Sequence, residues 1–251
     1  ETVLEGSFYF GTIVTPEGTE GCLTLDGLML HNTRVYDART QGEELGLTLR
    51  NCIFTGELTA TLVRTAALAE GSRRVRLDGF DALDAEGGLL FASASEITLE
   101  RIYFAHTKKF LGLTDYGRNL PAGAAGGRVS VTVKDCLFEA CETVHGLTVA
   151  LPEDIASACV RIEGCAFHQF VPEGEPAVTL CLPHEGCCAQ IKDVEFAGRQ
   201  RQKATAVLTA GCREAKVALE DVRVTGFDGT LSYKPPRRTQ APDCVGEAVW
   251  P

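Results

Sequence analysis

The side chains best suited to acid-base chemistry lie in and beside one long insertion, residues 106–127. A lysine or arginine there could act as a general base, and a nearby carboxyl group could donate a proton or hold a cation. Long loops on rigid scaffolds often carry function. A solvated polar loop without catalytic function would explain the same residues. The candidate catalytic residues are Lys108, Asp115, Arg118 and Glu142, and the candidate binding residues are Tyr116, His106 and His145.

Eleven cysteines form a second group of reactive side chains. Their odd number leaves at least one unpaired, and Cys52, Cys136 and Cys165 share a position that we expect to be interior, where a free cysteine packs as a small apolar residue. Cys136 and Cys165 should be near enough to be cross-linked, although a disulfide requires particular geometry. The set Cys22, Cys181, Cys187, Cys188, Cys212 and Cys244 matches no zinc-binding spacing.

No arrangement of residues predicts a resident cofactor. The sequence contains no phosphate-binding loop, no Gly-x-Ser-x-Gly motif and no His-Glu-x-x-His motif. His31 and His168 occupy equivalent outward positions, but they are five repeats apart, about 24 Å at the usual strand spacing, and cannot share a metal ion. We therefore predict no cofactor, with Ca²⁺ as the exception if the protein were a lyase.

A repeated pattern of alternating apolar residues must position all of these groups. Each copy reads apolar-x-apolar-x-(Gly/Asn/Asp)-apolar-x-apolar, and equivalent positions recur every 22 to 34 residues. Such a period is typical of a solenoid, in which each unit buries its apolar edge against its neighbours. The period-2 alternation and the residue types predict strands. The eight copies are Leu23–Leu30, Leu47–Phe54, Val75–Ala82, Ile97–Phe104, Val131–Phe138, Val160–Phe167, Ala189–Phe196 and Val217–Val224.

The fifth position of the pattern predicts a bend between two strands. Seven of its eight members are Gly, Asn or Asp, which tolerate the left-handed backbone of a sharp bend, and only Arg101 departs. A row of cation ligands is the alternative for the acidic members, but bend formation explains the glycines as well. This bend column comprises Gly27, Asn51, Gly79, Arg101, Asp135, Gly164, Asp193 and Asp221.

Stacking of the copies in register predicts three interior columns, with about 4.8 Å between neighbouring strands. Five of the twelve phenylalanines fall in the third column, so we expect them in the core. The first column is Leu25, Leu49, Leu77, Leu99, Val133, Ile162, Ile191 and Leu219; the second is Leu28, Cys52, Phe80, Ile102, Cys136, Cys165, Val194 and Val222; the third is Leu30, Phe54, Ala82, Phe104, Phe138, Phe167, Phe196 and Val224.

With these repeats, residues 20–228 resemble the right-handed parallel β-helix, or pectate-lyase-like, superfamily. The segment Val131–Cys141, with its Lys-x-Cys-x-Phe-x-x-Cys spacing, is similar to the coils of adenoviral β-helix proteins. The resemblance implies an all-β fold, a right-handed parallel β-helix solenoid of about eight coils with capped ends. Enzymes of the superfamily cleave acidic polysaccharides, whereas the viral proteins include a trimeric capsid-associated one.

Composition restricts the partners and the domain structure. The formal net charge of −10 argues against nucleic acid as a partner, because phosphate binding requires a basic surface. No segment approaches the roughly 20 apolar residues of a membrane-spanning helix. Since no linker interrupts the repeats, we expect one domain with three parts: an N-terminal capping strand at 1–20, the β-helix at 21–228 and a C-terminal cap or tail at 229–251.

One position that alternation places on the outside of the coils is largely apolar. Exposed apolar stripes tend to be covered, here either by a loop of the same chain or by another copy, because β-helices commonly pack side by side, often as trimers. Met29, Ile53, Tyr103 and Leu137 are the expected interface residues. The outward column, as we call it, comprises Met29, Ile53, Asp81, Tyr103, Leu137, Ala166, Glu195 and Arg223.

Two classes of function remain open, and an extracellular, cell-surface or virion location would suit either. The first is a structural or interaction protein, a rigid acidic module that forms a homo-oligomer and binds a surface or partner, as in a capsid, fibre or adhesin. The second, implied by the resemblance, is a polysaccharide lyase or glycoside hydrolase, with Lys108 or Arg118 as base and Asp115 or Glu142 as acid or cation ligand. We favour the first, because the aspartates form the bend column instead of clustering on one outward face.

Overall fold

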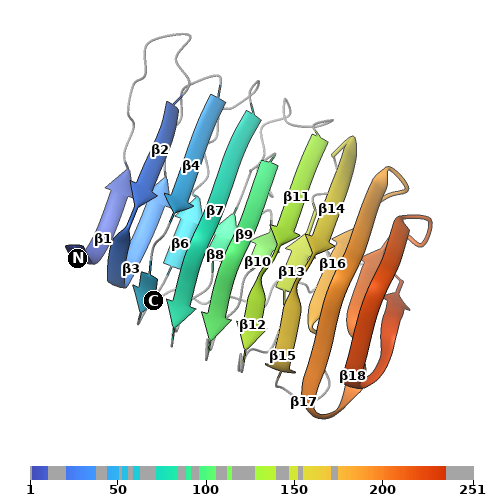
Figure 1. The fold of residues 1–251 in the computed structure, drawn as a ribbon. Coiled ribbons are helices and arrows are strands. Elements are labelled where there is room, and N and C mark those ends of the chain that lie inside the picture. The colour runs from blue at the N-terminus through green and yellow to red at the C-terminus, as the bar shows by residue number, and fades with distance from the viewer. Residues whose placement is uncertain are drawn as a thin grey trace, which may run out of the picture.

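The described part of the chain is all-β and contains no helix. The computed structural model describes residues 2–10, 21–37, 44–50, 53–55, 59–62, 72–83, 89–91, 96–105, 112–114, 128–139, 147–151, 155–170 and 175–235. Within these ranges one large sheet links all the strands, and neighbouring strands run parallel (Figure 1). The predicted all-β class and parallel pairing are therefore confirmed.

The strands vary from short segments of three residues to two long ones at the C-terminal side. In chain order they are β1 Thr2–Phe10, β2 Gly21–Asp26, β3 Leu28–Asp37, β4 Glu44–Arg50, β5 Ile53–Thr55, β6 Thr59–Leu62, β7 Ser72–Leu83, β8 Leu89–Phe91, β9 Glu96–Ala105, β10 Gly112–Thr114, β11 Arg128–Lys134, β12 Leu137–Glu139, β13 Leu147–Ala150, β14 Ser157–Glu163, β15 Ala166–Phe170, β16 Val178–Leu182, β17 Cys187–Gly211 and β18 Lys216–Lys234.

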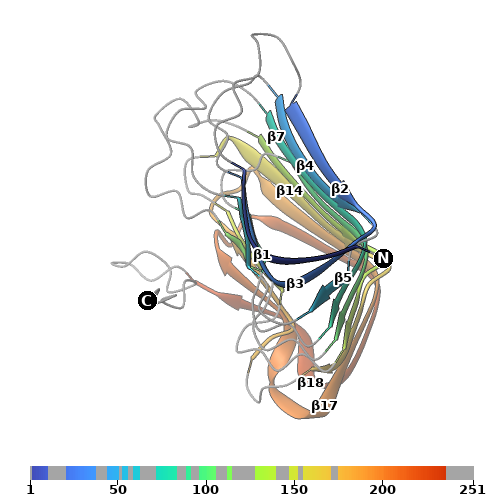
Figure 2. The same ribbon diagram turned by 90° about the vertical axis from the view of Figure 1, so that its left-hand side faces the viewer.

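The pairings follow three parallel ladders, each of which takes one segment from successive repeats. The first ladder joins β2, β4, β7, β9, β11, β14, β17 and β18. The second joins β3, β5, β7, β9, β12, β15, β17 and β18. The third runs from the end of β3 through β6, β8, β10, β13 and β16 to β17 and β18. In Figure 2, β2, β4, β7 and β14 lie side by side in one face, turned away from the face that contains β5.

The bend column separates the first ladder from the second. Gly27 and Gly164 have φ of 67° and 62°, and Asp135, Asp193 and Asp221 have φ between 51° and 52°. Arg101, the one member of the column with an unfavourable residue type, adopts the same conformation with φ of 52°. The position in the repeat, rather than the residue type alone, therefore imposes the left-handed backbone. Asn51 of this column lies outside the described residues.

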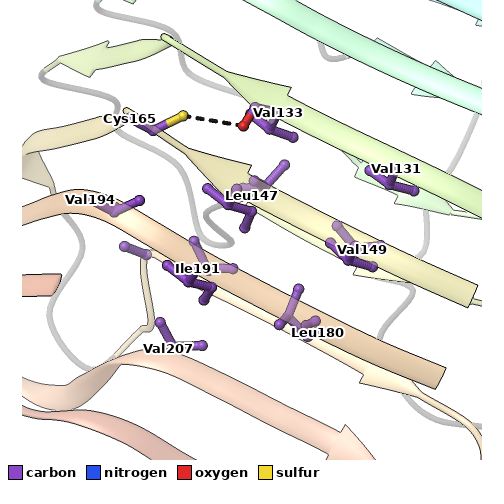
Figure 3. Packing of buried hydrophobic residues seen from close by; sticks show 14 of the residues in the cluster. Val131, Val133, Leu147, Val149, Cys165, Leu180, Ile191, Val194 and Val207 are labelled. Atoms are coloured by element: carbon purple, nitrogen blue, oxygen red, sulfur yellow. Dashed lines mark hydrogen bonds between the residues drawn. The ribbon is translucent and has the colours of Figure 1, made fainter. Parts of the chain in front are cut away.

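From Leu99 to Phe196, the members of the three interior columns whose burial the structure describes form one hydrophobic core. In the first column Leu99 pairs with Val133, Val133 with Ile162 and Ile162 with Ile191, and all four side chains are fully buried. Side chains from the third ladder, among them Leu147, Val149 and Leu180, pack in the same cluster (Figure 3).

The third interior column is a stack of aromatic rings. Phe138, Phe167 and Phe196 are each fully buried and pair in register. The ring centroids of Phe138 and Phe167 are 4.5 Å apart, and those of Phe167 and Phe196 are 5.0 Å apart, with interplanar angles of 12° and 20°. The strand spacing alone brings the rings to stacking distance, because each ring sits one strand above the last. The predicted register of this column is confirmed.

Two terminal segments bear on the predicted domain boundaries. β1 pairs with β3, so Thr2–Phe10 lies beside the first copy of the pattern. β18 continues to Lys234 and pairs with β17 over the range that includes Thr205 and Ala210, so the ladders extend beyond residue 228. The capping roles of residues 1–20 and 229–251 stay predictions.

Candidate functional site

The predicted catalytic and binding residues lie outside the described part of the chain. This holds for Lys108, Asp115, Arg118, Glu142, Tyr116, His106 and His145. Within the insertion at 106–127, however, Gly112–Thr114 forms β10, which pairs with β13 and touches β8 through Leu90. Part of the expected loop is thus a strand of the third ladder. The acid-base assignments stay predictions.

Metal-binding clusters and membrane-spanning helices are absent from the described ranges. No three His, Cys, Asp or Glu residues there come together as a group that could hold a metal ion. No helix in these ranges has the length and apolar character to cross a membrane.

The outward column is assembled in register along the second ladder. Met29 pairs with Ile53, Ile53 with Asp81 and Asp81 with Tyr103. Tyr103 pairs with Leu137, Leu137 with Ala166, Ala166 with Glu195, and Glu195 with Arg223. The column is therefore continuous from Met29, near the start of the chain, to Arg223, near its end. The register predicted for this column is confirmed.

The apolar members of this column are partly, not fully, withdrawn from solvent. Met29, Tyr103, Leu137 and Ala166 are all half-buried, whereas Glu195 and Arg223 are exposed. The neighbours of Leu137 in sequence, Cys136 and Phe138, are buried in the core. Because side chains alternate along a strand, Leu137 must point away from that core.

Polar contacts flank this apolar file. The Tyr103 hydroxyl donates a hydrogen bond of 2.6 Å to Glu139 Oε2 on the next strand of the ladder. Glu139 pairs in register with His168, whose Nε2 lies 3.5 Å from Glu195 Oε1. The arrangement is an apolar strip with acidic and imidazole groups beside it.

Two cysteines of the second interior column are enclosed in the core. Cys136 and Cys165 are each 2 % exposed. The Cys136 thiol lies 3.2 Å from the Lys134 carbonyl oxygen, and the Cys165 thiol lies 3.6 Å from the Val133 carbonyl oxygen (Figure 3). Hydrogen bonding with Cys165, together with burial, raises the pKa of the Cys136 thiol. Cys136 is therefore an inert structural thiol rather than a nucleophile.

A second pair of cysteines, Cys159 and Cys188, lies directly opposite each other on β14 and β17. Both are half-buried and both are free thiols. Burial, and next the hydrogen bond with Cys159, raises the pKa of the Cys188 thiol. The sequence analysis missed this pair. The signal was present, because each cysteine immediately precedes a copy of the pattern, at Val160 and Ala189.

The neighbouring Cys187 and His184 do not form a catalytic dyad, although their Sγ and Nε2 atoms are 3.8 Å apart. His184 Nδ1 accepts a hydrogen bond from the Gly186 backbone N–H, so Nε2 carries the proton of a neutral ring. Nε2 is 2.7 Å from the Ile155 carbonyl oxygen, to which it donates. The imidazole has no lone pair left for the thiol, and burial raises the pKa of Cys187.

Comparison with known proteins adds no identity to this site. No protein-family model, curated protein sequence or solved structure matches the chain.

Proposed function

We propose that this chain is a structural or interaction protein, a right-handed parallel β-helical module that self-assembles side by side through its outward column. The coiled arrangement is part of the proposal. Its support is that three separate parallel ladders each take one segment from the same succession of repeats. A chain that passes from the first to the second to the third ladder in every repeat is what a β-helix requires.

The observation that carries the proposal is the half-buried file of Met29, Tyr103, Leu137 and Ala166 on an acidic protein. Tyr103, Leu137 and Ala166 are consecutive over two strand spacings, about 10 Å, and Met29 lies three spacings before Tyr103, beyond Asp81. The ladders already fix the backbone of this column, so docking would cost side-chain entropy but no further backbone entropy. A partner with the same strip could therefore bury these side chains without that backbone cost, and a second copy of this chain is such a partner.

A homotrimer is the assembly that we expect, because the repeats resemble those of β-helix proteins that include a trimeric member, and a closed cyclic assembly would bring the apolar flank of each copy to the axis. The polar groups beside the strip would then lie at the rim. The Tyr103 hydroxyl, already bonded to Glu139, can keep its partner while the ring packs against a neighbouring chain.

The test is the mass of the protein in solution, measured by light scattering after size-exclusion chromatography. Wild type should have the mass of three chains of 26.9 kDa each, and Leu137→Lys should have the mass of one. Lysine at this position would bury an unpaired charge in the contact. The matched control is Thr132→Lys, a half-buried outward position on the neighbouring strand β11 that pairs with the exposed Arg161.

The control should keep the mass of the wild type. A monomeric wild-type protein would contradict the proposal, as would equal masses for the two lysine variants. Release of unsaturated sugars from an acidic polysaccharide by the monomer would replace it with the enzymatic alternative.

A further inference from the structure

We propose that Cys159 and Cys188 form a reversible oxidation site, a thiol pair that a low-molecular-weight disulfide converts into a covalent link between β14 and β17. The proposal does not depend on the function proposed above. It starts from the register of the first ladder, in which Cys159 and Cys188 are direct partners.

The register places the two cysteines at a distance that a disulfide can span. Directly paired residues on neighbouring strands have Cα atoms about 4.8 Å apart. Native disulfides join Cα atoms separated by roughly 4.4 to 6.8 Å. The Cα separation therefore permits a link, but the two strands must adjust slightly to bring the Cβ atoms within disulfide range.

Both thiols also point to the same side, away from the core. Ala158 and Val160, which flank Cys159, are buried, and so are Cys187 and Ala189, which flank Cys188. Alternation along each strand then directs the two cysteines outward. Their half-buried state leaves them accessible to a small oxidant, as the enclosed thiols of Cys136 and Cys165 are not.

The chemistry is a thiol–disulfide exchange in two steps. One cysteine thiolate attacks the oxidant disulfide, forming a mixed disulfide and releasing one small thiol. The second cysteine thiolate then attacks the protein sulfur of the mixed disulfide, forming the Cys159–Cys188 bond and releasing the second small thiol. The two cysteines lose two electrons and two protons in total, and the oxidant leaves as two thiols.

The link should be readily reduced. Side chains of aligned parallel partners project side by side, so their Cβ atoms lie near the strand spacing of about 4.8 Å, longer than the roughly 3.8 Å mean of native disulfides. A disulfide formed across that gap is strained, and strained disulfides have more oxidising potentials. The pair is thus suited to respond to the redox state of its surroundings.

The experiment uses the full native chain, reduced, freed of reductant and incubated with oxidised glutathione. Free thiols are then blocked by alkylation and counted by mass spectrometry under non-reducing conditions. In the wild type, peptide mapping under these conditions should show Cys159 and Cys188 both unalkylated and neither carrying glutathione. Cys159→Ser should instead retain one glutathione on Cys188, and Cys188→Ser one on Cys159.

Cys212→Ser is the matched control, because Cys212 is also partly exposed but lies 3.2 Å from Glu214 Oε2 instead of beside another cysteine in register. This variant should form the same link as wild type. Cys159→Ala and Cys188→Ala provide a second pair of variants that each lack one thiol. Circular dichroism confirms that every variant is folded before oxidation.

Three outcomes would overturn the proposal. The first is an unchanged number of free thiols in wild type. The second is the loss of two free thiols, without bound glutathione, in Cys159→Ser. The third is a disulfide in wild type that survives a large excess of reduced glutathione.

Discussion

The middle of the stack and its last described strand contain the same residue types at the same positions, yet they differ in burial. Ile191 in β17 is fully buried, whereas its register partner Leu219 in β18 is 37 % exposed. Leu231 and Tyr233, also in β18, are 41 % and 38 % exposed. A strand between two neighbours is covered on both edges, while β18 has a described partner only in β17. The burial of an apolar residue in this fold therefore depends on the strands on both sides of it, and not only on the strand that contains it.

The largest effect should come from the middle of the aromatic stack. Phe167→Ala should lower the free energy of unfolding by about 3–5 kcal/mol, because it leaves a cavity between Phe138 and Phe196. Val224→Ala, at the half-buried end of the same column, should cost about 1 kcal/mol. Urea denaturation monitored by circular dichroism measures both values. Equal costs would show that the end of the column is as well packed as its middle.

A backbone substitution should show the next largest difference. Gly211 has φ of 101°, and an added Cβ would collide with the carbonyl oxygen of Leu182 on the neighbouring strand, so Gly211→Ala should cost about 2–3 kcal/mol. Gly27 has φ of 67° with open space around it, and Gly27→Ala should cost only the conformational term of about 1 kcal/mol. Thermal unfolding compares the two variants. If Gly27→Ala were as unstable as Gly211→Ala, the collision with Leu182 would not be the cause of the larger cost at Gly211.

Leu219 tests the last strand directly. Leu219→Ala should cost about 1 kcal/mol, while Ile191→Ala on the adjacent strand should cost about 2–5 kcal/mol. The reason is that Leu219 buries less apolar area than Ile191 does in the folded protein, so its removal loses less hydrophobic stabilisation. Chemical denaturation again provides the measurement. A cost for Leu219 as large as for Ile191 would mean that another segment or another chain covers β18 in solution.

The smallest effect should come from the ion pair that links these two strands. Lys192 Nζ lies 2.8 Å from Glu220 Oε1, and both side chains are exposed. The hydrogen bond and charge of Glu220 raise the pKa of Lys192, so any stabilisation is complete below the ordinary lysine pKa and is lost only as pH rises through the raised value. Between pH 6 and 8 the pair is thus fully formed, but an exposed ion pair contributes little to stability, so Lys192→Ala should leave the denaturation midpoint almost the same as in wild type. A clear loss of stability in this window would show that the pair is shielded from solvent.

The repeat made much of the fold predictable. Alternation over Val131–Phe138 and Val160–Phe167 was enough to align Phe138 with Phe167 and Val133 with Ile162, because one strand spacing separates equivalent residues. The bend column was predictable for Asp135, Asp193 and Asp221 by residue type. Arg101 was not, because an arginine alone gives no reason to expect a left-handed backbone, and only its place in the stack imposes one.

The third ladder was not predictable from the same pattern. Its short strands, such as Leu147–Ala150 and Val178–Leu182, stand at no fixed distance from the repeat, since the connecting segments differ in length. A short apolar run of this kind does not distinguish a strand from other buried structure. The outward column was predictable by alternation, whereas the predicted acid-base residues lie outside the described part of the chain and stay predictions.

The sequence by itself determined which residues share a column, because a period-2 pattern repeated eight times permits one register that places the alternating apolar residues of every copy on the same face. The tertiary structure alone decided how deeply each member of a column is buried. Ile191 and Leu219 are register partners in the same interior column, yet Ile191 is fully buried and Leu219 is 37 % exposed. The physical reason is that burial depends on what the neighbouring strands and the other ladders place around a side chain, and no local stretch of sequence contains that information.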